Sequence, residues 1–195
     1  MQPKRILIIQ GHPDSDGQHL CHQLALSYQQ AADAAGHSTQ LLDVGRLNFP
    51  LLRSRKDWES GDICADIKAA QDAIAAADHL LIVYPLWLGA LPALLKGFLE
   101  QVLRPGFAFT YGAGMSWKRA LKGKSTRVIV TMGMPGWFYY LVYMAHTLRS
   151  LVRNILAFTG FGPNRTTVVG MAEGMSDARY QRCLSKVAAL GRKGI

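Results

Sequence analysis

The chain has 195 residues, and its 22 lysines and arginines outnumber its 13 aspartates and glutamates, for a formal net charge of +9. Hydrophobic residues make up 49% of the sequence, which supports a substantial core and excludes a disordered chain. Because Cys21, Cys64 and Cys183 form no closely spaced pair, a disulfide framework or a zinc ribbon is not expected. The length favours a single domain over residues 1–195.

Basic residues are scattered in short groups, at residues 53–56, 118–124 and 192–193, with no DNA- or RNA-binding motif between them. We therefore expect no nucleic-acid partner. A basic surface also suits anionic small molecules such as a flavin phosphate or a dinucleotide, which it attracts. The first residues lead directly into a strand pattern, without the apolar core and cleavage site of a signal peptide, so we expect a cytoplasmic protein.

The first half of the chain begins with an aliphatic run, residues 5–10, that predicts a strand buried on both faces. A turn-rich loop over residues 11–18 follows, and then a helix pattern that starts near Leu20 and is closed by Gly36. Residues 39–44 predict a second strand. Residues 45–62 have no clean period and are expected to be an irregular excursion, and residues 63–77 predict an alanine-rich helix.

The second half is organised around residues 79–109. Residues 79–84 predict a buried strand that Pro85 ends, and apolar residues at spacings of three and four predict a helix over about 91–103. Residues 104–124 form a long Gly-rich and aromatic connection. Residues 127–131 and 165–171 predict two more strands, separated by a loop at 132–140 and a helix over about 142–158. A closing helix is expected over residues 177–191.

The uncharged stretch over residues 80–95 does not predict a membrane span. It is sixteen residues long, whereas a spanning helix needs about 20 apolar residues. Pro85, Gly89 and Pro92 also interrupt it, and Arg149 and Arg153 exclude a membrane role for the later helix. We therefore expect no membrane insertion.

Strands and helices alternate five times, which predicts a doubly wound α/β fold with a five-stranded parallel sheet and helices on both faces. The order expected for such a short sheet is 2-1-3-4-5. In that order, the loops that begin near Gly11, Pro85 and Met132 meet in one crevice at the carboxyl ends of the strands. Ligands of open α/β sheets bind at this edge.

Two phosphate-binding patterns fail when their spacing is checked. Gly123-Lys124-Ser125 ends like a P-loop, but Lys118 stands where the first glycine is required. Gly112-Ala113-Gly114 begins like a dinucleotide fingerprint, but Trp117 stands at the third glycine position. Neither segment is therefore expected to bind phosphate.

The loop over residues 11–18 is the better anion site, because backbone N–H groups at a helix start carry the positive end of the dipole. Ser15, Gly17 and Gln18 could add donors. A carboxylate facing a phosphate would repel it, so we expect Asp14 or Asp16 to act as the helix N-cap instead. His12 or His19 could offset the negative charge, although each histidine could equally have a structural role.

Several motifs in order resemble the flavodoxin-like NAD(P)H:quinone oxidoreductases, the relatives of DT-diaphorase. The resemblance covers residue 4 to about residue 171 and is most specific in its central block. It rests on His12-Pro13-Asp14, Tyr84-Pro85-Leu86-Trp87, Pro92-Ala93-Leu94-Leu95-Lys96-Gly97-Phe98, Gly106-Phe107-Ala108-Phe109 and Thr131-Met132-Gly133-Met134-Pro135.

The resemblance implies a homodimer that holds a flavin, FMN or FAD, in the crevice. The first loop would meet the flavin phosphate, the second would line the ring, and the third would lie against the polar edge of the ring. The residues carried over are, for the phosphate, His12, Ser15, Asp16, Gly17, Gln18 and His19; for the ring, Pro85, Leu86, Trp87, Leu88 and Gly89; and for the polar edge, Thr131, Met132, Gly133 and Met134.

The resemblance also implies a catalytic tyrosine and histidine near the reduced flavin. Tyr139 stands at the tyrosine position, with Tyr140 and Tyr143 as alternatives, and His146 follows one residue later than the family spacing. The chain departs from the family in two places. Gly17, Gln18 and His19 replace the common Ser-Phe-Asn, and Leu88 and Gly89 replace bulky aromatic residues.

The function implied is a two-electron reductase in which NAD(P)H and a quinone-like acceptor occupy one pocket in turn. The alternative is a flavin-binding regulatory or ancillary protein with little turnover, such as a subunit of a potassium-efflux system. A flavodoxin-type electron carrier is less favoured, since such carriers are typically acidic and this chain has a net charge of +9.

Overall fold

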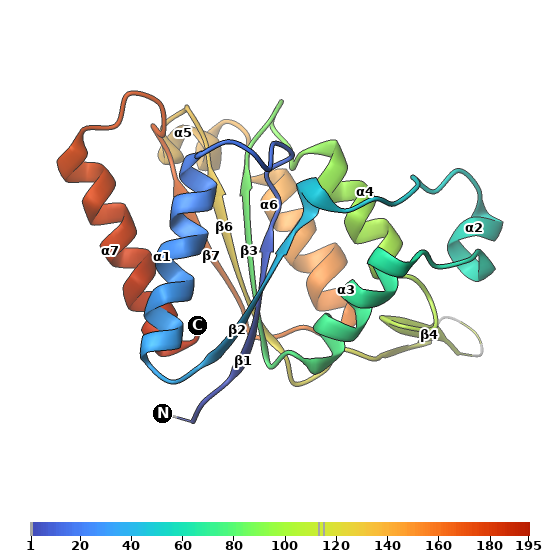
Figure 1. Cartoon of the computed structure of the whole chain (residues 1–195). Coiled ribbons are helices and arrows are strands. Elements are labelled where there is room, and N and C mark those ends of the chain that lie inside the picture. Colours follow the sequence, from blue (N-terminus) through green and yellow to red (C-terminus); the bar gives the residue numbers. More distant parts are fainter. Residues whose placement is uncertain (1, 113, 115) are drawn as a thin grey trace.

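The computed structural model shows a five-stranded sheet with helices on both faces, and it describes residues 2–112, 114 and 116–195 (Figure 1). The strand order is β2-β1-β3-β6-β7, and every neighbouring pair is parallel. Counted along the chain, this is the predicted order 2-1-3-4-5, which is confirmed. Ala113, part of the rejected dinucleotide pattern, lies outside the described residues.

The predicted strands and the main helices are all present, with small shifts at their ends. The strands of the sheet are β1 (Arg5–Gln10), β2 (Ser38–Asp43), β3 (His79–Pro85), β6 (Ser125–Thr131) and β7 (Asn164–Val169). The long helices are α1 (Leu20–Ala34), α3 (Ala65–Ala76), α4 (Ala93–Val102) and α7 (Asp177–Lys193).

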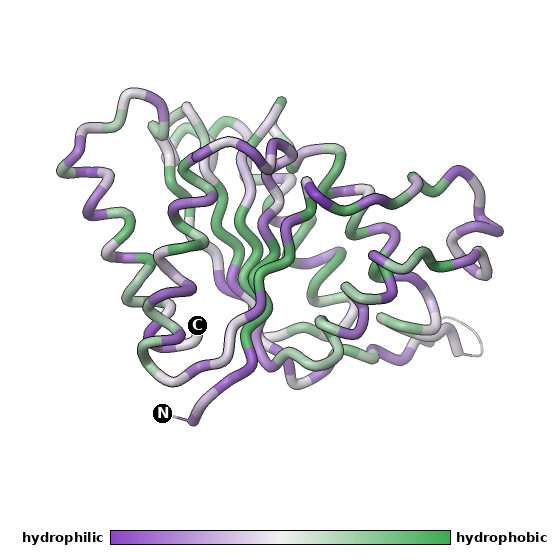
Figure 2. Tube along the Cα trace, in the orientation of Figure 1, coloured by the Kyte–Doolittle hydropathy of each residue, from purple (hydrophilic) through white to green (hydrophobic). Residues whose placement is uncertain are grey.

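Both faces of the sheet are covered, which explains the continuous aliphatic runs. All seven residues of β3 are buried. Side chains alternate between faces along a strand, so Ile6 and Ile8 pack with α1 and α7, while Leu7 and Ile9 pack with α3 and α4. Figure 2 shows the sheet as the most hydrophobic part of the chain between the two helical layers.

Three predicted segments differ from the structure. The excursion over residues 45–62 contains a turn of 3-10 helix, η1 (Val44–Arg46), and a short helix, α2 (Arg55–Ser60). The connection over 104–124 contains a hairpin of β4 (Phe109–Tyr111) and β5 (Trp117–Arg119). The loop over 132–140 contains α5 (Gly136–Leu141).

The single helix predicted over about 142–158 was wrong in its first part. Met144 and Ala145 have positive φ angles of 52° and 48°, which an α-helix cannot accommodate. The helix therefore begins later, as α6 (His146–Ser150), and continues as a π-helix, η2 (Leu151–Ala157). The break places Tyr139 and His146 on different elements.

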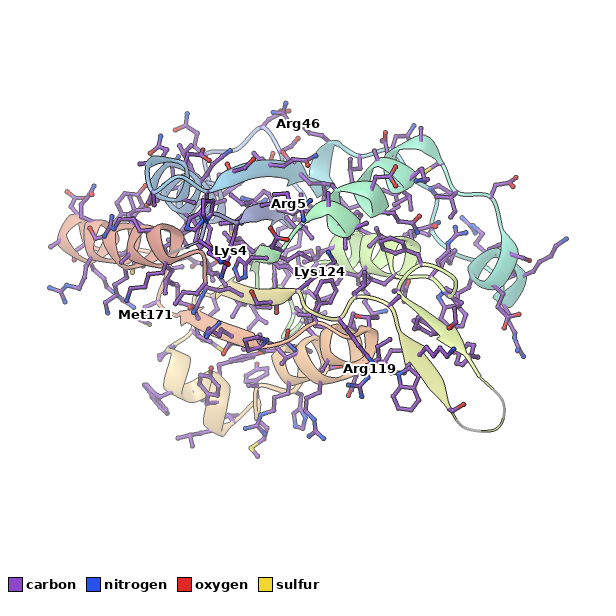
Figure 3. The ribbon with its side chains drawn as sticks, turned by 90° about the horizontal axis from the view of Figure 1, so that it is seen from below. Lys4, Arg5, Arg46, Arg119, Lys124 and Met171 are labelled. Atoms are coloured by element: carbon purple, nitrogen blue, oxygen red, sulfur yellow. The ribbon has the colours of Figure 1, made fainter. Side chains whose placement is uncertain are left out.

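The basic side chains are spread over several surfaces. Figure 3, seen from below, labels Lys4, Arg5 and Lys124 around the sheet, Arg46 beyond β2, and Arg119 on the hairpin. Arg5 pairs with Asp78, with 2.9 Å between its Nη2 and Oδ1 of the carboxylate. Within the described part of the chain, no helix is both long and apolar enough to span a membrane.

Candidate functional site

The three predicted loops meet at the carboxyl edge of the sheet. The N–H of Gly11 donates to the Val83 carbonyl at 2.8 Å, and the N–H of Leu86 donates to the Thr131 carbonyl at 2.7 Å. The edge of the His12 ring faces Trp87, with 5.6 Å between ring centroids. The first loop therefore touches the second, and the second is bonded to the third, so the predicted convergence of the three loops is confirmed, and their role as a ligand crevice stays a prediction.

His12 organises the start of the first loop. Its N–H donates to Oε1 of Gln10 at 3.1 Å. Its Nδ1 lies 3.1 Å from the Asp14 nitrogen and 3.2 Å from the Asp14 carbonyl oxygen, so it accepts the N–H in one tautomer and donates to the carbonyl in the other. Burial, followed by the charge of His19, lowers the pKa of His12 below its usual value and favours the neutral ring.

Asp14 is not the helix N-cap, so that prediction was wrong for it and also for Asp16. The N-cap of α1 is His19, and no side chain caps it. Asp14 Oδ1 instead accepts the N–H groups of Asp16 at 3.0 Å and Gly17 at 3.2 Å. Its Oδ2 accepts Nε2–H of His19 at 2.7 Å. These bonds, above all that from His19, hold the pKa of Asp14 below its usual value.

His19 folds back over the first loop. Its ring stacks on His12 with 3.9 Å between centroids and 15° between planes. His22 lies close to both rings, 5.4 Å from His12 and 5.7 Å from His19. Among the described residues, no group of three histidine, cysteine or acidic side chains is arranged to hold a metal ion.

Polar atoms without partners collect beneath this loop. Gln10 is only 2% exposed, and its Nε2 is buried without a hydrogen-bond partner. Both ring nitrogens of His22 are also buried and have no hydrogen-bond partner. Buried polar atoms are normally satisfied, so these three require a ligand or bound water. The Gln10 amide and a His22 ring N–H next to the first loop can donate to the phosphate end of a flavin, although the loop itself carries the acidic residues Asp14 and Asp16.

The second loop is a tight turn. Trp87 and Ala90 exchange two backbone hydrogen bonds of 2.9 Å each, and both central residues, Leu88 and Gly89, have positive φ angles of 48° and 75°. This conformation favours glycine, which explains Gly89 but leaves Leu88 strained. The Leu88 side chain is fully exposed, and Trp87 is 48% exposed. The turn thus presents two large apolar groups to solvent.

An apolar groove of about 480 Å³ runs from this turn to η2. Its walls are apolar except for Lys96, Thr147 and Ser150, and include Trp87, Leu91 and Ile155. Grooves of this size and character accept flat organic molecules. The groove therefore suits the ring of a cofactor, a nicotinamide or a quinone-like substrate.

The third loop is hydrogen-bonded to the end of β7 and to the residues that follow it. The N–H of Met132 donates to the Val169 carbonyl at 3.0 Å, and the Met134 carbonyl accepts the N–H of Met171 at 3.0 Å. Thr131 is buried, and its Oγ1 lies 3.2 Å from Sγ of Cys21. Gly133 is exposed, with the Glu173 carboxylate just beyond the position that a Cβ would take. Sequence reasoning missed Glu173, which precedes α7 in a polar loop without a motif.

The structure does not bring Tyr139 and His146 together. Tyr139 is fully buried, its hydroxyl lies 3.0 Å from Thr147 Oγ1, and that oxygen donates to the Gly89 carbonyl at 2.8 Å. The Tyr139 hydroxyl also accepts the N–H of Leu148 at 3.3 Å. His146 is exposed. Their catalytic roles stay predictions, and the geometry connects Tyr139 to the ring-lining turn through Thr147, a residue that sequence reasoning missed.

The parallel sheet in the order β2-β1-β3-β6-β7, with three loops gathered at its switch point, defines a doubly wound α/β protein. More specifically, the chain belongs to the flavodoxin-like family, since the model of the flavodoxin-like fold matches residues 4–190. The resemblance to NAD(P)H:quinone oxidoreductases is also confirmed by the relatives and structures found.

An uncharacterized NAD(P)H oxidoreductase of Haemophilus influenzae is 34% identical over 65% of this chain and 63% of its own length. YcaK, an uncharacterized NAD(P)H oxidoreductase of Escherichia coli, is 26% identical over 96% of both chains. The chain thus spans less than two thirds of the Haemophilus relative and nearly all of the Escherichia one. A potassium-efflux ancillary protein, KefG of Serratia proteamaculans, is 28% identical over 71% of this chain and 63% of its own length.

Two solved structures have the same fold over nearly the whole chain. Smu.1420 from Streptococcus mutans is 27% identical, with a TM-score of 0.79 over 97% of this chain and 99% of its own. The NAD(P)H:quinone oxidoreductase from Methanothermobacter marburgensis is 22% identical, with a TM-score of 0.80 over 98% of both chains. At that identity the second likeness shows the fold alone.

Proposed function

We propose that the protein is a flavin-dependent NAD(P)H:quinone oxidoreductase. The observation that carries the proposal is the juxtaposition of orphaned polar atoms under the first loop, Gln10 Nε2 and both nitrogens of His22, with an apolar groove that starts at Trp87. The polar atoms under the first loop fit a phosphate, and the apolar groove fits a flat ring. The names of the Haemophilus and Escherichia relatives support the same activity.

In this proposal a bound flavin, FMN or FAD, supplies the centre that accepts and donates hydride. The amides and imidazoles of the loop from Gly11 to His19 bind its phosphate. The turn from Pro85 to Gly89 positions the ring, and the backbone of Thr131 to Met134 donates toward its polar edge, where backbone N–H groups stabilise developing negative charge. The groove excludes water and holds NAD(P)H and the acceptor in turn. Parallel initial-velocity lines are expected, and a required ternary complex would contradict this alternation.

We also propose that the protein is a cytoplasmic homodimer. Large apolar side chains are exposed at the second loop, on α5 and just after α5, including Leu88, Trp137, Leu141 and Val142. Exposed apolar patches of this kind mark interaction surfaces. Light scattering of the purified protein at micromolar concentration tests the dimer, and a monomeric mass would contradict it.

The first test is an absorption spectrum after FMN or FAD has been added and the excess removed by gel filtration, followed by anaerobic NADPH or NADH. We expect a retained flavin band that is bleached by the reduced nicotinamide. The retained flavin identifies the cofactor. If no flavin is retained by the wild-type protein, the oxidoreductase proposal fails.

Replacing Tyr139 by phenylalanine is expected to slow flavin reduction by NAD(P)H severalfold. The change removes the bond that joins Tyr139 to Thr147 and, through it, to the Gly89 carbonyl. It should also lower the free energy of unfolding by about 1 kcal/mol, a typical value for one hydrogen bond. Stopped-flow measurement of the reductive half-reaction provides the rate.

Tyr140→Phe is the matched control, because the Tyr140 ring is exposed on the same helix. Thr147→Val should reproduce the slower rate if Tyr139 acts by positioning the turn. An unchanged half-reaction in Tyr139→Phe would remove this residue from the mechanism.

The second candidate is a flavin-binding ancillary protein with little turnover, a class suggested by the KefG relative. The observation that favours it is the occupied first loop, in which Asp14 takes the amides of Asp16 and Gly17. Retained flavin that NADPH and NADH reduce negligibly would support this candidate over the reductase.

A further inference from the structure

The Asp14 carboxylate lies in a cradle of donors suited to a phosphate. Its two oxygens accept the N–H groups of Asp16 and Gly17 and the Nε2–H of His19, at 3.0, 3.2 and 2.7 Å. Successive backbone N–H groups together with a side-chain N–H donor form the usual surroundings of a phosphate oxygen. A phosphate dianion cannot share these donors with a carboxylate, because like charges at contact distance repel.

The contact depends on two residues at which the chain departs from the pattern expected of its relatives. A Cβ at Gly17 would lie 2.1 Å from Nε2 and 2.4 Å from Cδ2 of His19, and 2.8 Å from Oδ2 of Asp14. A side chain at position 17 would therefore push the imidazole away. The position of the His19 ring depends on Gly17, because the absence of a side chain at Gly17 leaves room for the ring that donates to Asp14.

A second observation lies beneath the cradle. Gln10 is 2% exposed, its Oε1 accepts the N–H of His12, and its Nε2 is buried without a partner. This amide is thus fixed next to the first loop, with a donor in need of an acceptor. The two unpartnered ring nitrogens of His22 belong to a ring 5.4 Å from that of His12. Asp14 accepts from Asp16, Gly17 and His19, while Gln10 Nε2 and the His22 nitrogens have no partner.

We propose that Asp14, held by His19 over Gly17, is a built-in competitor that occupies the phosphate cradle of the first loop and lowers affinity for phosphorylated flavins. The inference rests on the proposed flavin function. Flavin phosphate enters only after the carboxylate has left, so the apparent dissociation constant rises by the reciprocal of the open fraction. Riboflavin lacks the phosphate and does not compete with Asp14.

The test compares Asp14→Ala with Asp16→Ala for binding of FMN and riboflavin, followed by quenching of flavin fluorescence. Both variants remove one negative charge from the same loop. Asp16 is the matched control because, among the described residues, its only ion pair is a 3.9 Å contact with Arg46, and the cradle N–H groups donate to Asp14 instead of to its carboxylate. If the closed loop is favoured ten to one, Asp14→Ala binds FMN about tenfold more tightly than wild type. We expect riboflavin affinity to stay within about twofold in both variants.

Three results overturn the inference while leaving the flavin proposal intact: wild type binds FMN and Asp14→Ala binds it no more tightly; Asp16→Ala gains as much as Asp14→Ala; or riboflavin gains as much as FMN. Tight FMN binding by Asp14→Ala, with none by the wild type, would support the competitor role of Asp14 and would contradict the oxidoreductase function proposed for the wild type. If neither protein binds any flavin, the flavin proposal fails.

Inorganic phosphate then decides the inference separately. Amide chemical shifts at positions 16 and 17 are followed during a phosphate titration of both variants. A response at lower phosphate concentration in Asp14→Ala than in Asp16→Ala supports a cradle that Asp14 blocks. Equal responses overturn it.

Discussion

Between pH 7 and pH 5, the free energy of unfolding of the wild type is expected to fall about 2 kcal/mol further than that of His79→Asn. His79 is fully buried at the start of β3, where its Nδ1 lies 2.8 Å from Ser125 Oγ and its Nε2 has no partner. Burial, followed by the charges of Lys4, Arg127, Arg165 and His37, lowers the pKa of His79 from 6.5 to about 3.

The free energy of unfolding falls as the pH falls because the unfolded chain binds a proton at His79 more readily than the folded protein does. Below pH 6.5 the unfolded chain takes up a proton at His79, whereas the folded ring stays neutral down to about pH 3. Each pH unit in this window therefore stabilises the unfolded state by about 1.4 kcal/mol. The stability contributed by the neutral ring is complete above pH 6.5 and is lost as the pH falls toward 3.

Denaturant unfolding of both proteins at pH 7, 6 and 5 measures the difference. Asparagine cannot titrate but keeps a polar group near Ser125, so the variant should start less stable and lose less with acid. His146→Asn serves as the control, because it makes the same replacement at an exposed ring. Parallel curves for wild type and His79→Asn would mean that the folded ring binds the proton as readily as the unfolded one.

The sheet could be predicted because its strands carry their signal locally. Residues of β1, β3 and β6 are buried on both faces, so each strand appears as an uninterrupted aliphatic run. The strand order then follows from alternation with helices and from right-handed crossovers. The convergence of the three loops was a consequence of that order and did not depend on any side chain.

The hairpin of β4 and β5 could not be found in the same way. Each strand has three residues, all exposed except Phe109, and the two strands form a separate hairpin outside the main sheet. The break at Met144 and Ala145 had no sequence signal either, because neither residue type favours a positive φ angle. Such features depend on how the surrounding elements pack.

The details of the candidate site were the least predictable. Asp14 was expected at a helix N-terminus because aspartate is a common N-cap. In the folded loop, Gly17 lets the His19 ring approach, and Asp14 finds stronger donors there than at the helix start. The sequence shows Gln10 as a polar residue at the end of a buried strand. That its amide Nε2 has no partner can be seen only in the folded structure.

The largest loss of flavin binding is expected from Gly170→Ala, at the end of β7. A Cβ there would lie 2.5 Å from the Gly136 nitrogen, 2.7 Å from the Met134 oxygen and 3.1 Å from the Pro135 carbonyl carbon. All three atoms belong to the backbone of the third loop and the start of α5, so no side chain can rotate away. The methyl group must move the segment that we propose lies against the polar edge of the flavin.

Overpacking of this kind costs about 1–3 kcal/mol of stability, and we expect FMN affinity to fall by at least about tenfold, equivalent to about 1.4 kcal/mol. Gly191→Ala is the matched control, since its Cβ would lie 2.3 Å from the Tyr28 carbonyl oxygen, where α7 crosses α1. That variant should lose comparable stability and keep its flavin affinity, because the clash is between two helices away from the three loops. Both dissociation constants are measured at a temperature where each variant is fully folded. Equal FMN affinity in the two variants would place the third loop outside the flavin site, whereas a loss confined to Gly170→Ala would identify it as part of that site.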